Sequence, residues 1–136
     1  MAGHDVMQSE LAACWPNAVL IRDDFGAQQL LRDVFPATPS RGRVHLVLRG
    51  TNFQMKVWEA LVHTEFGHVI SYQRLAERAG CPRASRAVGN ALAANQIGFL
   101  IPCHRVIRES GDVGNYRWGS ERKLAMLAWE AGKANR

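Results

Sequence analysis

Residues 99–108, FLIPCHRVIR, place a cysteine beside a histidine at the end of an apolar run. A thiol becomes a strong nucleophile as its thiolate, which a neighbouring base or positive charge favours. His104 follows Cys103 in the chain, but adjacency does not by itself bring the imidazole to the sulfur, so the proton path is direct or passes through a water. Such a base also needs a carboxylate that orients its ring. The candidate carboxylates are Glu109, Asp112, Glu121 and Glu130.

Two interpretations of the cysteine remain open at this point. Free cysteine is among the most buried residue types, so a purely structural Cys103 is the commoner case. The catalytic interpretation gains from Glu130, which lies late on a helix expected over residues 120–131 and would point at the core side of the site. The residues expected to face inward on this helix are Leu124, Leu127 and Ala128.

The composition is that of a globular protein, and the length fits one domain or one domain with a small appendage. The chain has 136 residues, of which 47% are hydrophobic and 21% charged. No apolar run approaches the roughly 18 residues of a membrane span, and no export signal is visible, so we expect a cytoplasmic protein without a membrane partner. Its cysteines, at positions 14, 81 and 103, form no CxxC pair, which argues against a disulfide framework or a zinc site.

All of the net charge of +5 lies in residues 71–123, which hold nine Arg and Lys against four Asp and Glu. This segment also contains the Cys-His pair. A phosphate-rich partner would be drawn to it, although a solvated basic surface has the same composition. We expect Arg105 and Arg108 to belong to this partner-facing charge, and they need not activate the thiol.

The first half of the chain predicts short elements around a linker. Thr51 and Gln54 match a capping box, which predicts a helix from there to about residue 64. Upstream we expect a helix over 5–13, a strand over 18–21, a helix from Asp23 or Asp24 to about 35, a Pro-rich linker over 35–43, and a strand over 44–48.

Residues 71–92 predict a helix-turn-helix. Ser71 is expected to cap the first helix, Gly80 to end it with a positive φ, and Pro82 to lie in the first turn of the second. The packing side of the second helix is expected to comprise Ala84, Ala87, Val88, Ala91 and Leu92. Its exposed edge carries Arg83, Arg86 and Asn90, and otherwise small residues. Such a helix suits shallow contact with a minor groove, whereas tight helix–helix packing is the competing interpretation.

The segments around the cysteine predict a shaped pocket. Asn95 is expected to hold a left-handed cap after the second helix, and residues 97–101 to form a buried strand that Pro102 ends. Three glycines then surround Tyr116 and Trp118 in GDVGNYRWG, residues 111–119, which we call the aromatic loop. Its rings would give aromatic walls to a pocket for a flat ring.

Four blocks, ISYQRLA, RAVGNALAAN, FLIPCHRVI and GNYRWG, together resemble the 6-O-alkylguanine-DNA alkyltransferase family, with Ada-type bacterial members nearest in pattern. The resemblance runs without gaps from about Arg49 to Glu130. It implies an α+β, mainly helical fold, with a winged-helix-like catalytic and DNA-binding domain over 49–136. Residues 1–48 resemble the last part of the family's N-terminal domain, without its sheet.

The resemblance also implies direct-reversal DNA repair. One alkyl group, chiefly methyl, would move irreversibly from O6 of guanine, with O4 of thymine as a further candidate, to the protein after base flipping. The partner would be double-stranded DNA carrying 6-O-alkylguanine, bound by a monomer that needs no cofactor and no metal.

Residue roles follow by position. The catalytic set is Cys103 as acceptor, His104 as base through a water, Glu130 orienting it, Tyr72 helping to rotate the nucleotide, and Lys123. The DNA-binding set is Arg86, which would intercalate, with Tyr72, Arg83, Ala84 and Asn90. The guanine pocket would comprise Asn95 as hinge, Val106, Tyr116, Arg117 and Trp118.

Three other functions remain to be weighed. An alkyltransferase-like protein would bind the lesion without transfer, and such proteins typically carry Trp in place of the acceptor cysteine. A transcriptional regulator would leave Cys103, His104 and the aromatic loop unexplained. A Cys-His-Glu hydrolase would turn over repeatedly. Many family members have Gly where this chain has Trp118, so we expect a narrow pocket that favours methyl over benzyl groups.

Overall fold

The computed structural model describes residues 3–36 and 43–135, and the chain divides into two compact units between Leu48 and Arg49. The first unit contains α1 (His4–Cys14) and α2 (Asp24–Val34), neither of which buries a residue. Asp23 caps α2 by accepting a hydrogen bond from the Gly26 amide at 2.8 Å, as its side chain and position predicted.

The strands predicted over 18–21 and 44–48 are wrong, because both segments are irregular in the structure. A strand is stable only when its backbone groups pair with a neighbour, and within the described part of the first unit no second strand is available. Apolar residues alone therefore did not make these runs into a sheet.

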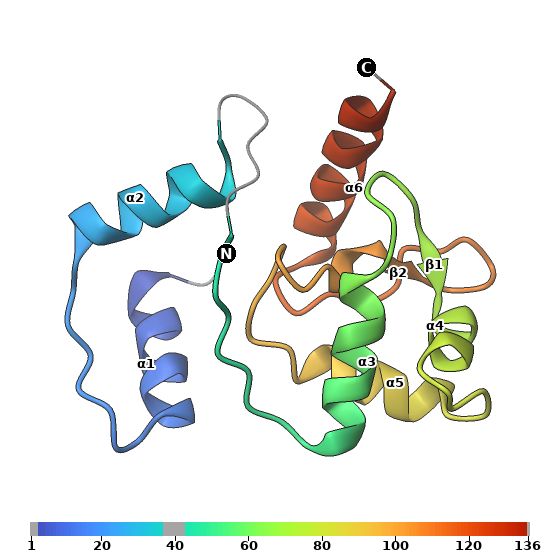
Figure 1. Cartoon of the computed structure of the whole chain (residues 1–136), viewed down its shortest axis with the longest axis horizontal. Helices are drawn as coiled ribbons and strands as arrows, with labels where there is room; N and C mark the ends of the chain where they lie inside the picture. Colours follow the sequence, from blue (N-terminus) through green and yellow to red (C-terminus); the bar gives the residue numbers. More distant parts are fainter. Residues whose placement is uncertain (1–2, 37–42, 136) are drawn as a thin grey trace. The chain divides into compact units, whose positions relative to one another are not determined.

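The second unit is built on three helices that pack on one another: α3 (Asn52–Val62), α4 (Tyr72–Arg78) and α5 (Ser85–Ala93) (Figure 1). Thr51 and Gln54 form the predicted capping box, with both reciprocal hydrogen bonds present. The indole of Trp58 donates to the Ala91 carbonyl at 2.9 Å and so ties α3 to α5. The core residues around this contact are Val57, Trp58, Leu61, Leu75, Ala76, Val88, Ala91 and Leu92.

The helix-turn-helix forms with one correction. Ser71 caps α4 through the Arg74 amide, and Gly80 has the predicted positive φ of 79°. Pro82 lies in the turn between the helices, not in the first turn of α5, which begins at Ser85. Ala87, expected on the packing side, is exposed, because the buried side of the shorter α5 starts at Val88.

A two-stranded parallel ladder joins this unit to the cysteine. β1 (Ile70–Ser71) precedes α4, and β2 (Val106–Ile107) follows the 3-10 helix η1 (Cys103–Arg105). Ile70 pairs with Val106 and Ser71 with Ile107. The class predicted from the sequence, mainly helical α+β, is confirmed.

The last helix, α6 (Ser120–Ala134), buries a different side from the one predicted. Leu124 is 52% exposed and Ala128 is exposed, whereas Lys123 and Glu130 are almost fully buried. These two lie seven residues apart, which is close to two turns and places them on one side of the helix. The apolar pattern misled the sequence prediction because this side of α6 faces a polar site. Among the described residues no helix has the length and apolarity needed to cross a bilayer.

Candidate active site

Cys103 lies at the start of a tight turn and is 6% exposed. The Asn95 amide nitrogen donates to the Cys103 Sγ at 3.3 Å and to the Ile101 carbonyl at 3.1 Å, and its oxygen accepts from the Ile97 amide at 2.9 Å. The expected left-handed cap at Asn95 is wrong, because its side chain organises the turn instead. Asn95 thus fixes both the thiol and the segment that leads to it.

The segment 97–101 is a series of turns, not the strand predicted. Within the described chain, Phe99 is the non-glycine residue with a positive φ, at 68°. Its ring lies parallel to the His104 imidazole, with an interplanar angle of 4° and centroids 6.2 Å apart. The turns therefore place an aromatic ring parallel to the histidine and near it.

His104 and Glu130 form the predicted base–carboxylate pair. The distance from His104 Nε2 to Glu130 Oε1 is 2.7 Å, and both side chains are fully buried. Burial lowers the pKa of His104 because it disfavours the imidazolium, and Arg105 and Lys123 act in the same direction, against the opposing effect of Glu130. The neutral ring therefore carries its hydrogen on Nε2 and leaves Nδ1, which has no hydrogen-bond partner among the described residues, able to accept a proton.

The other candidate carboxylates do not reach the histidine. Glu109 accepts from the Ser71 hydroxyl at 2.5 Å, and Asp112 accepts from the Ser110 hydroxyl at 3.0 Å. Glu121 lies exposed in the first turn of α6. Of the four carboxylates that the sequence left open, Glu130 is the one paired with His104.

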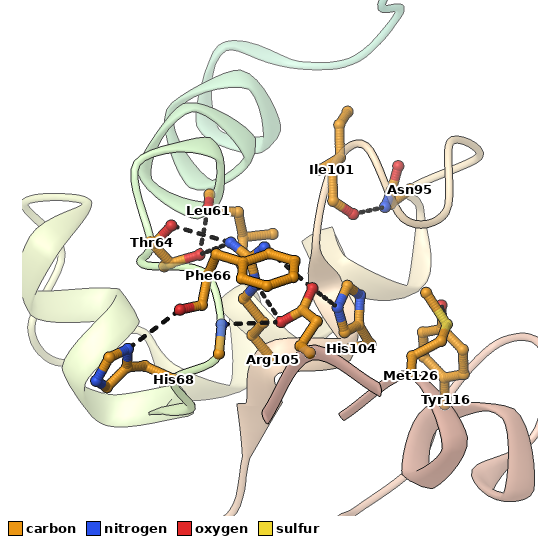
Figure 2. Close-up of polar contacts among 12 residues, drawn as sticks. Leu61, Thr64, Phe66, His68, Asn95, Ile101, His104, Arg105, Tyr116 and Met126 are labelled. Atoms are coloured by element: carbon orange, nitrogen blue, oxygen red, sulfur yellow. Dashed lines mark hydrogen bonds and ion pairs between the residues drawn. The ribbon is translucent and has the colours of Figure 1, made fainter. Parts of the chain in front are cut away.

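Arg105 overturns the expectation that it belongs to the exposed basic surface. It is 9% exposed, and its guanidinium donates to both oxygens of Glu130, at 2.9 and 3.0 Å. It also donates to the Thr64 carbonyl at 2.9 Å and the Thr64 hydroxyl at 3.1 Å. Figure 2 shows His104 and Arg105 meeting at one carboxylate. Sequence reasoning missed Arg105 and Thr64, although a buried Glu130 requires a nearby cation.

The charge on this carboxylate is held by its neighbours. Burial alone would raise the pKa of Glu130, but hydrogen bonds from Arg105 and His104 lower it overall. The Gly67 amide adds a longer contact of 3.4 Å. Glu130 is therefore ionised at neutral pH and keeps the imidazole in one orientation.

The thiol is neutral at rest. Burial raises the pKa of Cys103, and the hydrogen bond from Asn95 and the charge of Lys123 offset this only in part. Lys123 itself is buried, and its Nζ donates to the Val106 carbonyl at 2.5 Å and to the Asn115 carbonyl at 3.5 Å. Lys123 thereby joins the turn after Cys103 to the aromatic loop.

A pocket of about 470 Å³ opens over the thiol. Its lining brings together residues from α4, α5 and the aromatic loop: Tyr72, Gly89, Asn90, Leu92, Ala93, Cys103, Asn115, Tyr116 and Arg117. Of the residues predicted for the pocket, Tyr116 and Arg117 line it, whereas Asn95 and Val106 lie buried beside Cys103 and Lys123. Burial strongly raises the pKa of Tyr116, so its hydroxyl remains a hydrogen-bond donor at neutral pH.

A second hollow of about 580 Å³ lies between the segment 64–71 and α4. It is lined by polar side chains, including Glu65, His68 and Glu77, and contains neither Cys103 nor His104. The chemistry therefore belongs to the smaller pocket.

A family model described as "6-O-methylguanine DNA methyltransferase, DNA binding domain" matches residues 52–132. The chain belongs to this family. The bifunctional transcriptional activator and DNA repair enzyme Ada of Escherichia coli is 43% identical over 126 residues, covering 90% of this chain and 36% of Ada. The methylated-DNA–protein-cysteine methyltransferase of Mycobacterium bovis is 42% identical over 109 residues, covering 80% of this chain and 66% of its own length.

Solved structures of methyltransferase-family proteins share the fold. Mycobacterium tuberculosis OGT in complex with DNA superposes with a TM-score of 0.71 and 42% identity, over 79% of this chain and 67% of OGT. The chain thus spans about a third of the Ada relative and about two thirds of the mycobacterial proteins.

In this methyltransferase-family domain the predicted DNA-binding residues gather beside the pocket. Arg86 is exposed in the first turn of α5, and Asn90, one turn later on the same side, lines the pocket. Arg83 is exposed in the preceding turn, and Ala84 is the half-buried N-cap of α5. Tyr72, at the start of α4, also lines the pocket, close to Gly89 of α5.

Trp118 backs the pocket without lining it. Its ring meets the ring of Tyr116 edge-on, with centroids 5.3 Å apart, and lies close to Gly98, where a Cβ would come within 3.1 Å of the indole. The guanidinium of Arg117 lies 5.8 Å from the Trp118 ring centroid. Trp118 therefore acts on the pocket through Tyr116 and Arg117.

Proposed function

We propose that this chain is a DNA repair protein that transfers an alkyl group, chiefly methyl, from O6 of guanine in DNA to Cys103. The observation that carries the proposal is that the Cys103 thiol lines a pocket and is followed directly in the chain by His104, a buried imidazole hydrogen-bonded to the buried carboxylate of Glu130. Relatives named methylated-DNA–protein-cysteine methyltransferase support it. On this proposal, residues 49–136 form the catalytic DNA-binding domain, and residues 1–48 correspond to the end of an N-terminal domain.

The chemistry begins with the buried pair. Glu130 holds the Nε2–H of His104, so Nδ1 accepts the Cys103 proton, directly or through a water. The thiolate attacks the alkyl carbon, the S–C bond forms, and the C–O6 bond breaks with its electrons passing to guanine. Guanine regains one proton, balancing the one that the thiol lost, and hydrogen bonding from a tyrosine hydroxyl or a loop amide assists its departure.

The product explains why the transfer happens once for each molecule. A thioether has no ready hydrolytic route back to the thiol. The transfer as written needs no cofactor. DNA would be bound by the helix-turn-helix through the minor groove, with Arg86 taking the place of the flipped base. Such a protein acts as a monomer where bacterial DNA lies, in the cytoplasm.

The decisive experiment weighs the intact protein after incubation with a duplex that carries one 6-O-methylguanine. We expect each molecule to gain one methyl group in place of the thiol hydrogen, and the duplex to regain guanine. Cys103→Ser should gain nothing, whereas Cys14→Ser and Cys81→Ser should react like the unchanged protein. Tight binding of the duplex without any gain in mass would favour a lesion-binding protein, and repeated release of product would favour a hydrolase.

The edge-on packing of Trp118 against Tyr116 predicts a preference for small alkyl groups. We expect rapid reaction with methylated DNA and slow reaction with free 6-O-benzylguanine, because the indole supports a pocket wall that a benzyl ring must displace. Trp118→Gly should accelerate the benzyl reaction by about tenfold or more, the scale on which pocket volume discriminates substrates. Mass spectrometry of time points measures both rates.

Trp129→Leu is the matched control for this prediction, because Trp129 packs on Phe66 and Phe99 and does not line the pocket. It should leave the ratio of benzyl to methyl rates unchanged. Rapid benzyl transfer by the unchanged protein would show that Trp118 does not restrict the pocket.

A further inference from the structure

Near Tyr72, which lines the pocket, lies an arginine that the proposed chemistry does not use, Arg108. Gly114 has a positive φ of 74°, and the place where its Cβ would stand lies 3.5 Å from the Tyr72 hydroxyl and 3.7 Å from Nε of Arg108. Tyr72 lines the pocket with Cys103. The Tyr72 hydroxyl and the Arg108 guanidinium thus border one small space beside the pocket wall, which Gly114 leaves open.

The charge of Arg108 is available to a ligand. The residue is exposed, and within the described chain its guanidinium makes no ion pair or hydrogen bond. The two nearest acidic residues in sequence are engaged elsewhere, Glu109 with Ser71 and Asp112 with Ser110. Arg105, three positions earlier, is buried against Glu130, whereas Arg108 is exposed, so the two arginines of this motif differ in environment.

The backbone of Arg108 is held in place. Its amide donates to the Asp112 carbonyl, and its carbonyl accepts from the Gly111 amide, both at 2.9 Å. The charge of Arg108 also acts on two interior groups. It lowers the pKa of Tyr72, which burial raises, and it adds to the lowering of the pKa of Lys123 by burial. Arg108 therefore presents an exposed, unneutralised cation beside Tyr72, from a backbone that two hydrogen bonds hold in place.

We propose that Arg108 binds the backbone phosphate of the nucleotide whose base enters the pocket, with the Tyr72 hydroxyl beside it. This inference rests on the proposed function. A base that occupies the pocket stays bonded to its sugar and phosphate, which must remain at the mouth. A guanidinium can bind two phosphate oxygens at once, which makes arginine the preferred residue for this task. Any side chain at position 114 would fill the space between the two groups.

The test compares a substrate that has this phosphate with one that lacks it. Arg108→Ala should slow transfer from a methylguanine duplex at low DNA concentration by about tenfold to a hundredfold, the range for losing a charge-assisted hydrogen bond. The slope of log affinity against log salt should become shallower by about one. With the free base 6-O-methylguanine at high concentration, the rate should equal that of the unchanged protein.

Arg78→Ala is the matched control, since it removes the same charge from the last turn of α4, on the side of the second hollow. It should slow the duplex reaction much less than Arg108→Ala. An equal loss from both variants, an equal loss on the free base, or no loss on the duplex would each overturn the phosphate site. If the unchanged protein gains no methyl from the duplex, the proposed function itself fails, and this inference with it.

Discussion

Replacing Glu130 with glutamine is expected to lower the free energy of unfolding by about 3–5 kcal/mol, the range for removing one partner of a buried ion pair. Arg105 would remain buried with its charge uncompensated, although its bonds to Thr64 would persist. The amide of glutamine cannot accept both guanidinium hydrogen bonds and the imidazole hydrogen bond at once. Urea unfolding of the unchanged protein and the variant measures the difference.

A double-mutant cycle separates the ion pair from general damage to the core. Arg105→Met should also destabilise, but the double variant Arg105→Met with Glu130→Gln should cost clearly less than the two single losses added together. Additive losses would show that Arg105 and Glu130 are not energetically coupled, and a loss below about 1 kcal/mol for Glu130→Gln would contradict the prediction.

Glu130 and His104 together predict how the stability of the fold depends on pH. The pKa of Glu130 is lowered in the folded state, so its contribution is present above its ordinary value and is lost as the pH falls through the folded pKa. The pKa of His104 is also lowered, so below its ordinary value near 6.5 the unfolded chain takes up a proton that the folded chain refuses. Both groups therefore weaken the fold on the acid side.

Replacing His104 with asparagine is expected to slow alkyl transfer at pH 7 by about 10²- to 10⁴-fold, the usual contribution of a general base. Burial raises the pKa of Cys103, so without the imidazole nearly all of the thiol stays protonated at this pH. The rate of the variant should rise with pH as the thiolate forms unaided. The rate of the unchanged protein should fall only below the lowered pKa of His104.

Single-turnover rates on a methylguanine duplex between pH 5 and 10 would test this. His68→Asn is a suitable control, since His68 is exposed and lies outside the pocket that holds Cys103. It should leave the rate profile unchanged. A His104→Asn variant that keeps the rate and the profile of the unchanged protein would exclude His104 as the base.

Local signals in the sequence predicted the parts of the fold that depend on neighbouring residues. Thr51, Ser71 and Gly80 act within one turn of a helix, so their types and spacing were sufficient to place α3 and α4. The apolar runs at 18–21, 44–48 and 97–101 predicted strands wrongly, because strand formation depends on a partner elsewhere in the fold.

The site was only partly predictable for the same reason. Spacing identified Cys103 and His104, but the partner carboxylate lies 26 residues further along the chain, so the residues alone left four candidates. Arg105 resembles every other basic residue of its segment, and only the tertiary structure shows that it is buried on Glu130. On α6, the buried polar pair Lys123 and Glu130 runs against the apolar pattern.

The short parallel ladder sets where this domain tolerates changes in length. Its two residue pairs hold β1 beside β2. Tyr72 follows β1 directly and the turn of Cys103 precedes β2 directly, so the ladder fixes these two residues relative to each other. Residues inserted into the turn between α4 and α5 would lengthen a connection that lies outside the ladder. A single residue inserted between Cys103 and Val106 would shift the register and turn each side chain of β2 to the opposite face. The ladder therefore constrains chain length between Cys103 and Val106 more strongly than between α4 and α5.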